Sequence, residues 1–170
     1  MANHVQQYWP VLGLDPLRES VSNAVWYTVL ADRFRFPDYI IAPEYYLDNG
    51  TKVDLVVLDS KGGDLWPVFA MEGKGNPCSD WQFTQAAAQA RPYISQMKRM
   101  SNDRRYGMIV AGKQVAILAW SGGNDLQKVI CTNLVLDTIK ELTAWDIQNS
   151  SGALDNIFNA VEALIRNTAV

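Results

Sequence analysis

The sequence predicts an α/β domain in which helices flank a mixed central sheet. Apolar residues recur at helical spacing near both ends of the chain, and an alanine-rich helical stretch spans residues 79–100. Between these stretches, short runs rich in β-branched and aromatic residues end at turn signals such as Asn49-Gly50. The predicted order is a helix, three strands, a helix, two strands and a closing helix, which favours helices on both faces of the sheet.

Length and composition indicate one soluble domain covering residues 1–170. The chain has 170 residues, of which 48% are hydrophobic, so a sizeable core is expected. The net charge of −3 argues against non-specific nucleic-acid binding over the whole surface, although a local basic groove stays possible. No apolar run approaches the ~20 residues of a membrane span, so no membrane partner is expected.

The cysteines and the single histidine limit the kinds of metal and catalytic site that the chain is expected to contain. Cys78 and Cys131 form no CxxC pair, which leaves a disulfide framework or a structural zinc site unsupported. We therefore expect an intracellular protein, cytoplasmic or nuclear. The only histidine is His4, in a terminal segment expected to be mobile, so an enzyme of this sequence would have to use carboxylates, lysines or tyrosines.

The first half of the chain is expected to form one helix and three strands. The helix is predicted over 15–33, with Pro16 in its first turn and an apolar stripe that ends before Pro37. Strands are predicted over 39–47, where Pro43 marks an edge or a bulge, and over 52–59 and 66–72.

The second half is expected to contain a long helix, a hairpin and a closing helix. The long helix runs from the N-cap Ser79 to about Met100, and Pro92 predicts a kink in it. Strands over 106–111 and 114–120 form the hairpin. Residues 129–136 fit either a strand or a helix. The closing amphipathic helix covers 154–165.

Three charged residues on the second and third predicted strands carry the strongest functional signal. Asp54 interrupts an otherwise apolar strand, where the cost of burying a charge demands a reason. Glu72 and Lys74 end the next strand and point to the same face, because side chains alternate along a strand. If the two strands are neighbours, all three side chains converge.

This set of side chains suits metal-assisted phosphodiester hydrolysis. Asp54 and Glu72 are hard oxygen ligands of the kind Mg²⁺ prefers, and Mn²⁺ is the expected substitute. The ion would activate a water and neutralise charge on a phosphate. Lys74 would orient that water, help to deprotonate it or stabilise the developing charge. Gly73 and Gly75 are expected to leave the backbone open to a phosphodiester chain.

These residues resemble the PD-(D/E)XK, or restriction-endonuclease-like, nuclease superfamily. Its signature is an acidic residue on one strand and Glu/Asp-x-Lys on the next, within an αβββαβ core. Asp54 matches the first position and Glu72-Gly73-Lys74 match the tripeptide. The resemblance covers about residues 15–120 and leaves 121–170 as a C-terminal helical elaboration. Val53 stands where the superfamily often has proline.

The resemblance extends to the two predicted helices beside these strands. It implies that Glu19 on the first helix completes the metal site. It also matches Gln89-x-x-x-Tyr93 to a pattern of the RecB-like branch. Gln85 lies one turn before Gln89 on the same face, so either glutamine is a candidate catalytic residue.

The resemblance implies a Mg²⁺-dependent nuclease that acts on DNA in preference to RNA, possible as a homodimer. A second function is a catalytically silent domain of the same fold that serves as a protein-interaction or effector module. In a third interpretation, Glu72 and Lys74 form only a solvated surface pair. A basic group near the end of the long helix would bind a phosphate backbone or merely complement the helix dipole: Lys98, Arg99, Arg104 and Arg105.

Overall fold

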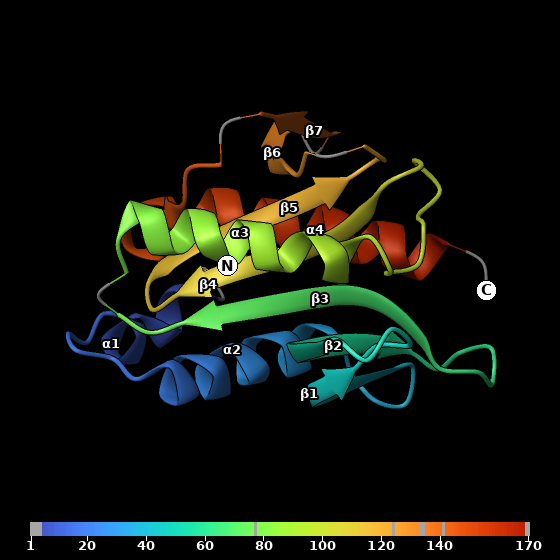
Figure 1. Ribbon diagram of the computed structural model, residues 1–170, viewed down its shortest axis with the longest axis horizontal. Coiled ribbons are helices and arrows are strands. Elements are labelled where there is room, and N and C mark those ends of the chain that lie inside the picture. Colours follow the sequence, from blue (N-terminus) through green and yellow to red (C-terminus); the bar gives the residue numbers. More distant parts are fainter. Residues whose placement is uncertain (1–4, 77, 124, 133–134, 141, 169–170) are drawn as a thin grey trace.

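The fold is built on one mixed, open sheet that runs through most of the chain (Figure 1). The computed structural model describes residues 5–76, 78–123, 125–132, 135–140 and 142–168; the side chains of Val5 and Trp81 and the predicted mobile segment around His4 lie outside this description. Within these residues the sheet has eight strands in the order β1 to β7, with β8 paired to β5. The prediction of an α/β domain with a mixed sheet and flanking helices is confirmed.

The first long helix begins later than the sequence predicts. A 3₁₀ turn (Val5–Tyr8) and a short helix α1 (Trp9–Leu12) come first, and α2 spans Glu19–Arg33. The predicted start near Asp15 is wrong because Leu17 forms a small antiparallel bridge with Asn76. Both backbone groups of Leu17 hydrogen-bond to those of Asn76 at 2.8 Å, so they are not available to a helix.

Three strands follow α2 as an antiparallel meander. Strand β1 spans Tyr39–Tyr46, β2 spans Lys52–Asp59 and β3 spans Trp66–Lys74. The tight turn after β1 uses Gly50 at φ +79°, a backbone conformation that glycine adopts without strain. Strand β3 is two residues longer than predicted, which places Glu72 and Lys74 inside the sheet.

Helix α3 (Asp80–Ile94) crosses back over the sheet and makes the next strand parallel to β3. It begins with the expected Ser79 cap, completed by Gln82 in a reciprocal capping box. It ends at Ile94 and not at the predicted Met100. Pro92 lies in the last turn, and beyond it the N–H of Lys98 pairs with the carbonyl of Pro67 at 2.7 Å, which draws the chain onto β3.

The remaining chain extends the sheet before it forms the last helix. Strands β4 (Arg105–Ala111) and β5 (Gln114–Trp120) form the predicted hairpin. The region left open between strand and helix contains β6 (Gln127–Thr132) and β7 (Val135–Ile139). The expectation of a helical elaboration over 121–170 is therefore wrong in part, since β6 and β7, which are rich in β-branched residues, pair as antiparallel strands before the last helix.

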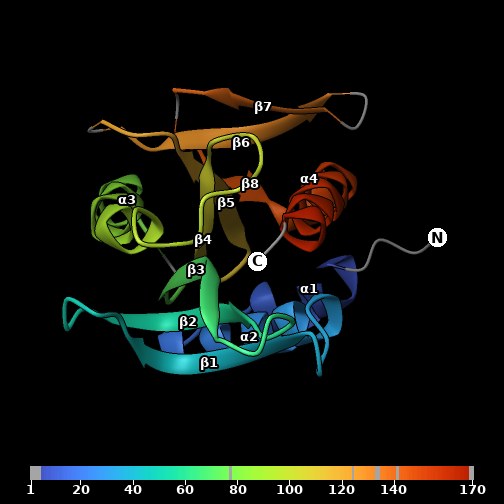
Figure 2. The ribbon, with the colours of Figure 1, turned by 90° about the vertical axis from the view of Figure 1, so that its right-hand side faces the viewer.

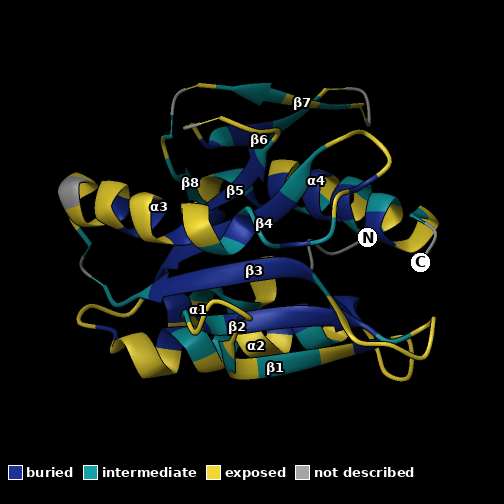
Figure 3. Ribbon diagram, turned by 45° about the vertical axis from the view of Figure 1, so that its right-hand side comes forward, coloured by how far each residue is buried: buried dark blue, intermediate teal, exposed yellow. Residues whose placement is uncertain are grey.

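The last helix closes the opposite face of the sheet. After β8 (Trp145–Asp146), α4 spans Ile147–Asn167, with non-helical dihedrals at Ser150, so it begins earlier than predicted. Helices α2 and α4 pack on one face of the sheet and α3 packs on the other. Figure 2 shows α3 and α4 on opposite sides of β4 and β5. The buried strands between these layers appear in dark blue in Figure 3. None of the described helices combines the length and hydropathy that a membrane crossing needs.

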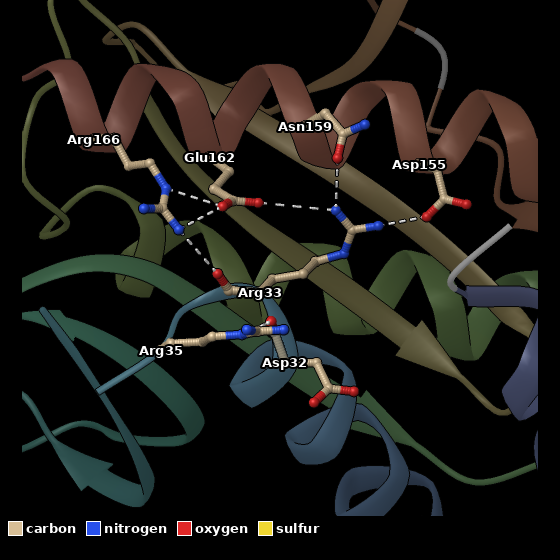
Figure 4. A network of polar contacts seen from close by, with 7 residues as sticks. All are labelled: Asp32, Arg33, Arg35, Asp155, Asn159, Glu162 and Arg166. Atoms are coloured by element: carbon tan, nitrogen blue, oxygen red, sulfur yellow. Dashed lines mark hydrogen bonds and ion pairs between the residues drawn. The ribbon is translucent and has the colours of Figure 1, made fainter. Parts of the chain in front are cut away.

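A buried guanidinium group joins the two helices on the α2–α4 face (Figure 4). Arg33, at the end of α2, is buried and forms an ion pair with Asp155 of α4. It also donates to Asn159 at 3.0 Å and approaches Glu162 at 4.0 Å. Burial lowers the pKa of Arg33, and the charges of Asp155 and Glu162 oppose that shift, so the carboxylates keep the buried cation in place.

We expect this network to make Arg33 important for the stability of the fold, in contrast to its exposed neighbour Arg35. Replacing Arg33 with methionine leaves Asp155 without the cation that it pairs with, while Glu162 keeps its ion pair with Arg166, so we expect a loss of about 3 kcal/mol in the free energy of unfolding. Arg35→Met, whose parent side chain is exposed, is the matched control and should change it by less than about 0.5 kcal/mol. Urea denaturation measures both, and equal losses would contradict the assigned role.

Candidate active site at the ends of β2 and β3

The structure brings Asp54, Glu72 and Lys74 together at one end of the β2–β3 pair. The backbone pairing of these strands ends at Leu55 and Met71. Beyond it, a carboxylate oxygen of Asp54 accepts the N–H of Gly73 at 2.8 Å. Lys74 donates from Nζ to Oε1 of Glu72 at 2.7 Å. The convergence that the strand pattern predicts therefore occurs through one hydrogen bond and one ion pair.

Strand β1 changes its backbone where it passes Asp54. The pairs Pro43–Leu55 and Tyr45–Val53 flank Glu44, which has φ +48°. This left-handed conformation is costly for a residue that is not glycine, and such strain is typical of functional sites. The predicted bulge or edge at Pro43 corresponds to this irregularity.

Glu72 is a buried carboxylate in a negatively charged neighbourhood. Only 6% of its surface is exposed. Burial raises the pKa of Glu72, the hydrogen bond from Lys74 lowers it, and the charges of Asp54 and Glu19 raise it further; the net shift is upward. Glu19, Asp54 and Glu72 are thus close enough to repel one another, and a bound cation would relieve that repulsion.

Lys74 is held in its charged form. Burial lowers the pKa of Lys74, but its hydrogen bond with Glu72 and the charges of Glu72, Glu19 and Asp54 outweigh burial and raise it. A lysine with a raised pKa is a poor general base at neutral pH. Of the three roles expected for Lys74, this environment favours stabilisation of negative charge.

The two glycines beside these residues accommodate α2 and do not open the backbone to a ligand. A Cβ atom on Gly73 would overlap the side-chain amide of Asn23. A Cβ on Gly75 would lie 2.8 Å from the carbonyl oxygen of Leu17. The expectation that these glycines admit a phosphodiester chain is therefore wrong, because the start of α2 occupies that space and brings Glu19 to the strand ends.

Asn23 is a site residue that sequence reasoning missed. Its Oδ1 atom is buried beside Gly73 and has no hydrogen-bond partner within the described part of the chain. Its spacing of four residues from Glu19 puts both on one face of α2, and that spacing was the available signal. A hollow of about 470 Å³ opens between α2 and β1–β2, and Glu19, Asn23 and Asp54 line it.

Of the residues on α3, Tyr93 interacts more directly with the carboxylates of the site than either predicted glutamine does. Gln85 and Gln89 are both exposed, and their catalytic role stays a prediction. The half-buried Tyr93 continues their stripe one turn later. Burial raises the pKa of Tyr93, and the charges of Glu72 and Asp54 raise it further. Its phenol therefore stays protonated within electrostatic range of both carboxylates and can act as a donor.

The predicted basic group lies at the other end of β3. Arg105 begins β4 and stacks on Trp120, with 5.1 Å from its guanidinium carbon to the ring centre. Arg99 pairs with Asp103 at 3.2 Å. Five residues of β3, roughly 16 Å, separate Pro67 beside Lys98 from Glu72. Lys98, Arg99, Arg104 and Arg105 are therefore not brought to the carboxylates, and phosphate binding by them stays a prediction.

The donor set fits a divalent cation only in part as the side chains stand. Among the described residues, no three His, Cys, Asp or Glu side chains surround a common point closely enough to hold an ion. Asp54 and Glu72 each use one oxygen, for Gly73 and Lys74. Their remaining oxygens, with Glu19 nearby, supply the hard donors that suit an ion retaining several waters.

Comparisons with known proteins add no relative that would assign this site. No family model matches the chain, and neither the curated proteins nor the solved structures gave a match. The function therefore has to be argued from the geometry and electrostatics of these residues.

Packing of Asn23 on Gly73 can be tested with a double-mutant cycle. Gly73→Ala places a methyl group where the Asn23 amide lies, so we expect a loss of about 1–3 kcal/mol in the free energy of unfolding. Asn23→Ala removes the overlapping atoms, and the double variant should recover most of that loss. Strictly additive losses in urea denaturation would show that the two residues are not coupled.

The raised pKa of Glu72 gives a pH-dependent stability with a definite sign. The folded protein binds this proton more tightly than the unfolded chain, so stability falls as pH rises from about 4.3, the ordinary value for glutamate, through the raised value. Glu72→Gln keeps an acceptor for Lys74 and abolishes that fall.

We therefore expect Glu72→Gln to exceed the wild type in free energy of unfolding at neutral pH and to lose this advantage below a pH of about 4. Denaturation curves at several pH values measure the difference. Asp64→Asn, at an exposed turn residue, is the control. A variant less stable than the wild type at neutral pH would contradict the electrostatic account.

Proposed function

We propose that this chain is a metal-dependent nuclease of the PD-(D/E)XK type that hydrolyses phosphodiester bonds, with DNA preferred to RNA. The observation that carries the proposal is the convergence of Asp54, Glu72 and Lys74 at the ends of two adjacent strands. The order of α2, the β1–β3 meander, α3 and a β4 parallel to β3 fits the αβββαβ core that this proposal requires.

Each side chain has a separate role in the proposed hydrolysis. Asp54 and Glu72, with Glu19, would hold Mg²⁺ or Mn²⁺, and the bound ion would lower the pKa of a water and neutralise phosphate charge. Lys74, kept protonated, stabilises the charge that develops on the phosphoryl oxygens. Tyr93 is a protonated donor near both carboxylates, and Gln85 or Gln89 would orient the site after side-chain movement.

Electrostatics support a functional reason for this arrangement. A buried glutamate beside two further carboxylates costs stability that an apolar side chain would not. The ion pair with Lys74 offsets only part of that cost, since the pKa of Glu72 remains raised. A cation that binds here would be attracted by all three carboxylates and would relieve their mutual repulsion.

A second candidate is a catalytically silent domain that serves as a protein-interaction or effector module. The specific observation in its favour is that Glu72 already pairs with Lys74 and that the described carboxylates do not surround one point. Such a module has no need to bind Mg²⁺ or Mn²⁺ at these strand ends, and metal binding separates the two functions.

Cleavage assays test the proposal directly. Purified protein is incubated with single- and double-stranded DNA and RNA in the presence of Mn²⁺, beside the Asp54→Ala, Glu72→Gln and Lys74→Ala variants. We expect cleavage, and a loss of at least ~100-fold in rate in each variant, because each removes a group that stabilises transition-state charge. Asp64→Asn, in the turn at the far end of the β2–β3 hairpin, should keep the wild-type rate.

Two results would overturn the assignment. If Lys74→Ala left the rate unchanged, the activity would come from another site or from a contaminant. If the wild type cleaved no substrate and bound no metal, the interaction module would become the better account of the same residues.

A further inference from the structure

Strand β1 leaves one edge of the sheet without a neighbouring strand. It is the first strand in the sheet order, and within the described residues it pairs with β2 alone (Figure 2). The N–H of Tyr39 donates to the carbonyl of Arg35 at 3.1 Å and so points away from β2. One position earlier, the carbonyl of Asp38 accepts the N–H of Ser60, just past the end of β2, at 3.0 Å. Because backbone groups alternate along an antiparallel ladder, the N–H and C=O of Ile41 point to the open edge.

The part of this edge that can accept a further strand is short. Natural edge strands avoid unwanted pairing through proline, charged side chains and bulges. Pro43 has no N–H, and Glu44 follows it at φ +48°. The segment from Tyr39 to Ala42 has neither feature, and its sequence Tyr-Ile-Ile-Ala is apolar. An added strand would therefore pair around Ile41.

Two hollows lie between α2 and β1, and Tyr27 of α2 lines both. The first has a volume of about 460 Å³ and contains Ile41, and the second has about 470 Å³ and contains Pro43. Residues two apart in a strand face the same side, about 7 Å from each other. Side chains i and i+2 of an added strand have the same spacing, so each of them would meet one hollow.

The first hollow is lined mainly by apolar side chains. Phe36 is 82% exposed, Tyr27 is 39% exposed and Ile40 is 37% exposed, so accessible apolar surface gathers at this hollow. The charged residues that line it, Asp32 and Arg35, are opposite in sign. Exposed apolar side chains that are contiguous mark an interaction site, whereas scattered ones do not. We call this hollow the apolar hollow.

The second hollow is acidic. Glu19, Glu44 and Asp54 line it, and Lys52 is the one cation among its lining residues. Lys52 pairs with Glu44 at 2.8 Å, so the lining holds no further cation to balance Glu19 and Asp54. Charge complementarity therefore favours a cationic side chain here and disfavours a phosphate group. We call this hollow the acidic hollow.

An extended peptide that carries a basic and an apolar residue two positions apart matches the edge and both hollows. Such peptides add a strand to an exposed sheet edge through main-chain hydrogen bonds, and pockets for alternate side chains supply the specificity. A helical partner would offer no free backbone groups to Ile41, because its own hydrogen bonds use them. Arginine suits the acidic hollow, since its planar guanidinium group binds carboxylates in bidentate geometry.

The open backbone groups of Ile41 also set the direction of the peptide. In an antiparallel pair, one residue exchanges both hydrogen bonds with the residue opposite. A peptide antiparallel to β1 reaches Pro43 before it reaches Ile41. Its basic residue therefore precedes its apolar residue by two positions.

We propose that β1 binds a segment of a partner protein as an added antiparallel strand, with an apolar residue in the apolar hollow opposite Ile41 and an arginine two residues earlier in the acidic hollow. The inference goes beyond the proposed function, because it needs neither a bound metal nor hydrolysis.

A short peptide tests the inference without a catalytic assay. The probe is the blocked peptide Ser-Thr-Arg-Thr-Leu-Thr-Ser, titrated into the isotope-labelled full chain in EDTA, so that divalent cations do not compete for Glu19 and Asp54. We expect the amide signal of Ile41 to shift and its N–H to become protected from exchange with water, because this N–H gains a hydrogen bond. Signals of β7, at the opposite border of the sheet, should stay unchanged.

Two modified peptides separate strand addition from simple charge attraction. N-methylation of the leucine keeps every side chain and the charge but removes the backbone donor to Ile41, so binding should weaken by about tenfold. The reversed peptide Ser-Thr-Leu-Thr-Arg-Thr-Ser keeps the composition but carries the arginine away from the acidic hollow. Its binding should weaken to a similar extent.

Variants of the protein test the two hollows. Phe36→Ala should weaken binding of the probe, and Val135→Ala, at a 68% exposed residue of β7, is its matched control. Glu44→Gln should weaken binding and reduce its dependence on salt concentration, whereas Asp64→Asn, at an exposed turn residue, should do neither. Circular dichroism verifies that each variant is folded.

The outcomes separate this inference from the proposed function. Binding that shifts Ile41 and weakens on N-methylation would support the added strand, whether or not the protein cleaves nucleic acid. Equal binding of the probe, its N-methylated form and its reversed form would indicate charge attraction alone and overturn the inference. No shift of Ile41 up to millimolar peptide would also overturn it, and Mn²⁺-dependent cleavage by the same protein would leave the proposed function intact.

Discussion

Gly73 holds β2, β3 and α2 in the arrangement that forms the candidate site. Its N–H is fixed by the Asp54 carboxylate, its Cα lies against the Asn23 amide, and its two neighbours in the chain form the Glu72–Lys74 ion pair. Because interiors are closely packed, a side chain at this position would displace α2 from β3. The distance between Glu19 and the strand carboxylates therefore depends on the absence of one Cβ atom.

The packing around Gly73 also brings charged groups together. Three carboxylates and one ammonium group gather where the ladder between β2 and β3 ends, and both Glu72 and Lys74 have raised pKa values as a result. The ammonium group is fixed in its charged form while the carboxylates remain in mutual repulsion. An environment of this kind would attract a cation, as the proposed nuclease requires, and it is a poor environment for base catalysis by lysine.

The sequence predicted the elements well where the signal was local and poorly where distant partners decided the outcome. Periodicity located β2 to the residue, and the Asp54, Glu72 and Lys74 pattern predicted their convergence. The start of α2 depends on the bridge between Leu17 and Asn76, and the end of α3 depends on the bond between Lys98 and Pro67. Neither contact produces a local sequence pattern that could have predicted it. The contact of Asn23 with Gly73 and the hollow between α2 and β1–β2 likewise arise only when helix and strands are packed together.

We propose that the ends of β2 and β3, with the start of α2, form a divalent-cation site. Mn²⁺ is paramagnetic, so titrating it into isotope-labelled protein at substoichiometric amounts broadens the amide signals nearest to the bound ion. The account predicts that the signals of Glu19, Asp54, Glu72 and Gly73 disappear first and that they persist in the Asp54→Asn variant. Broadening spread over exposed carboxylates such as Asp64 and Asp103, with Gly73 unaffected, would contradict it.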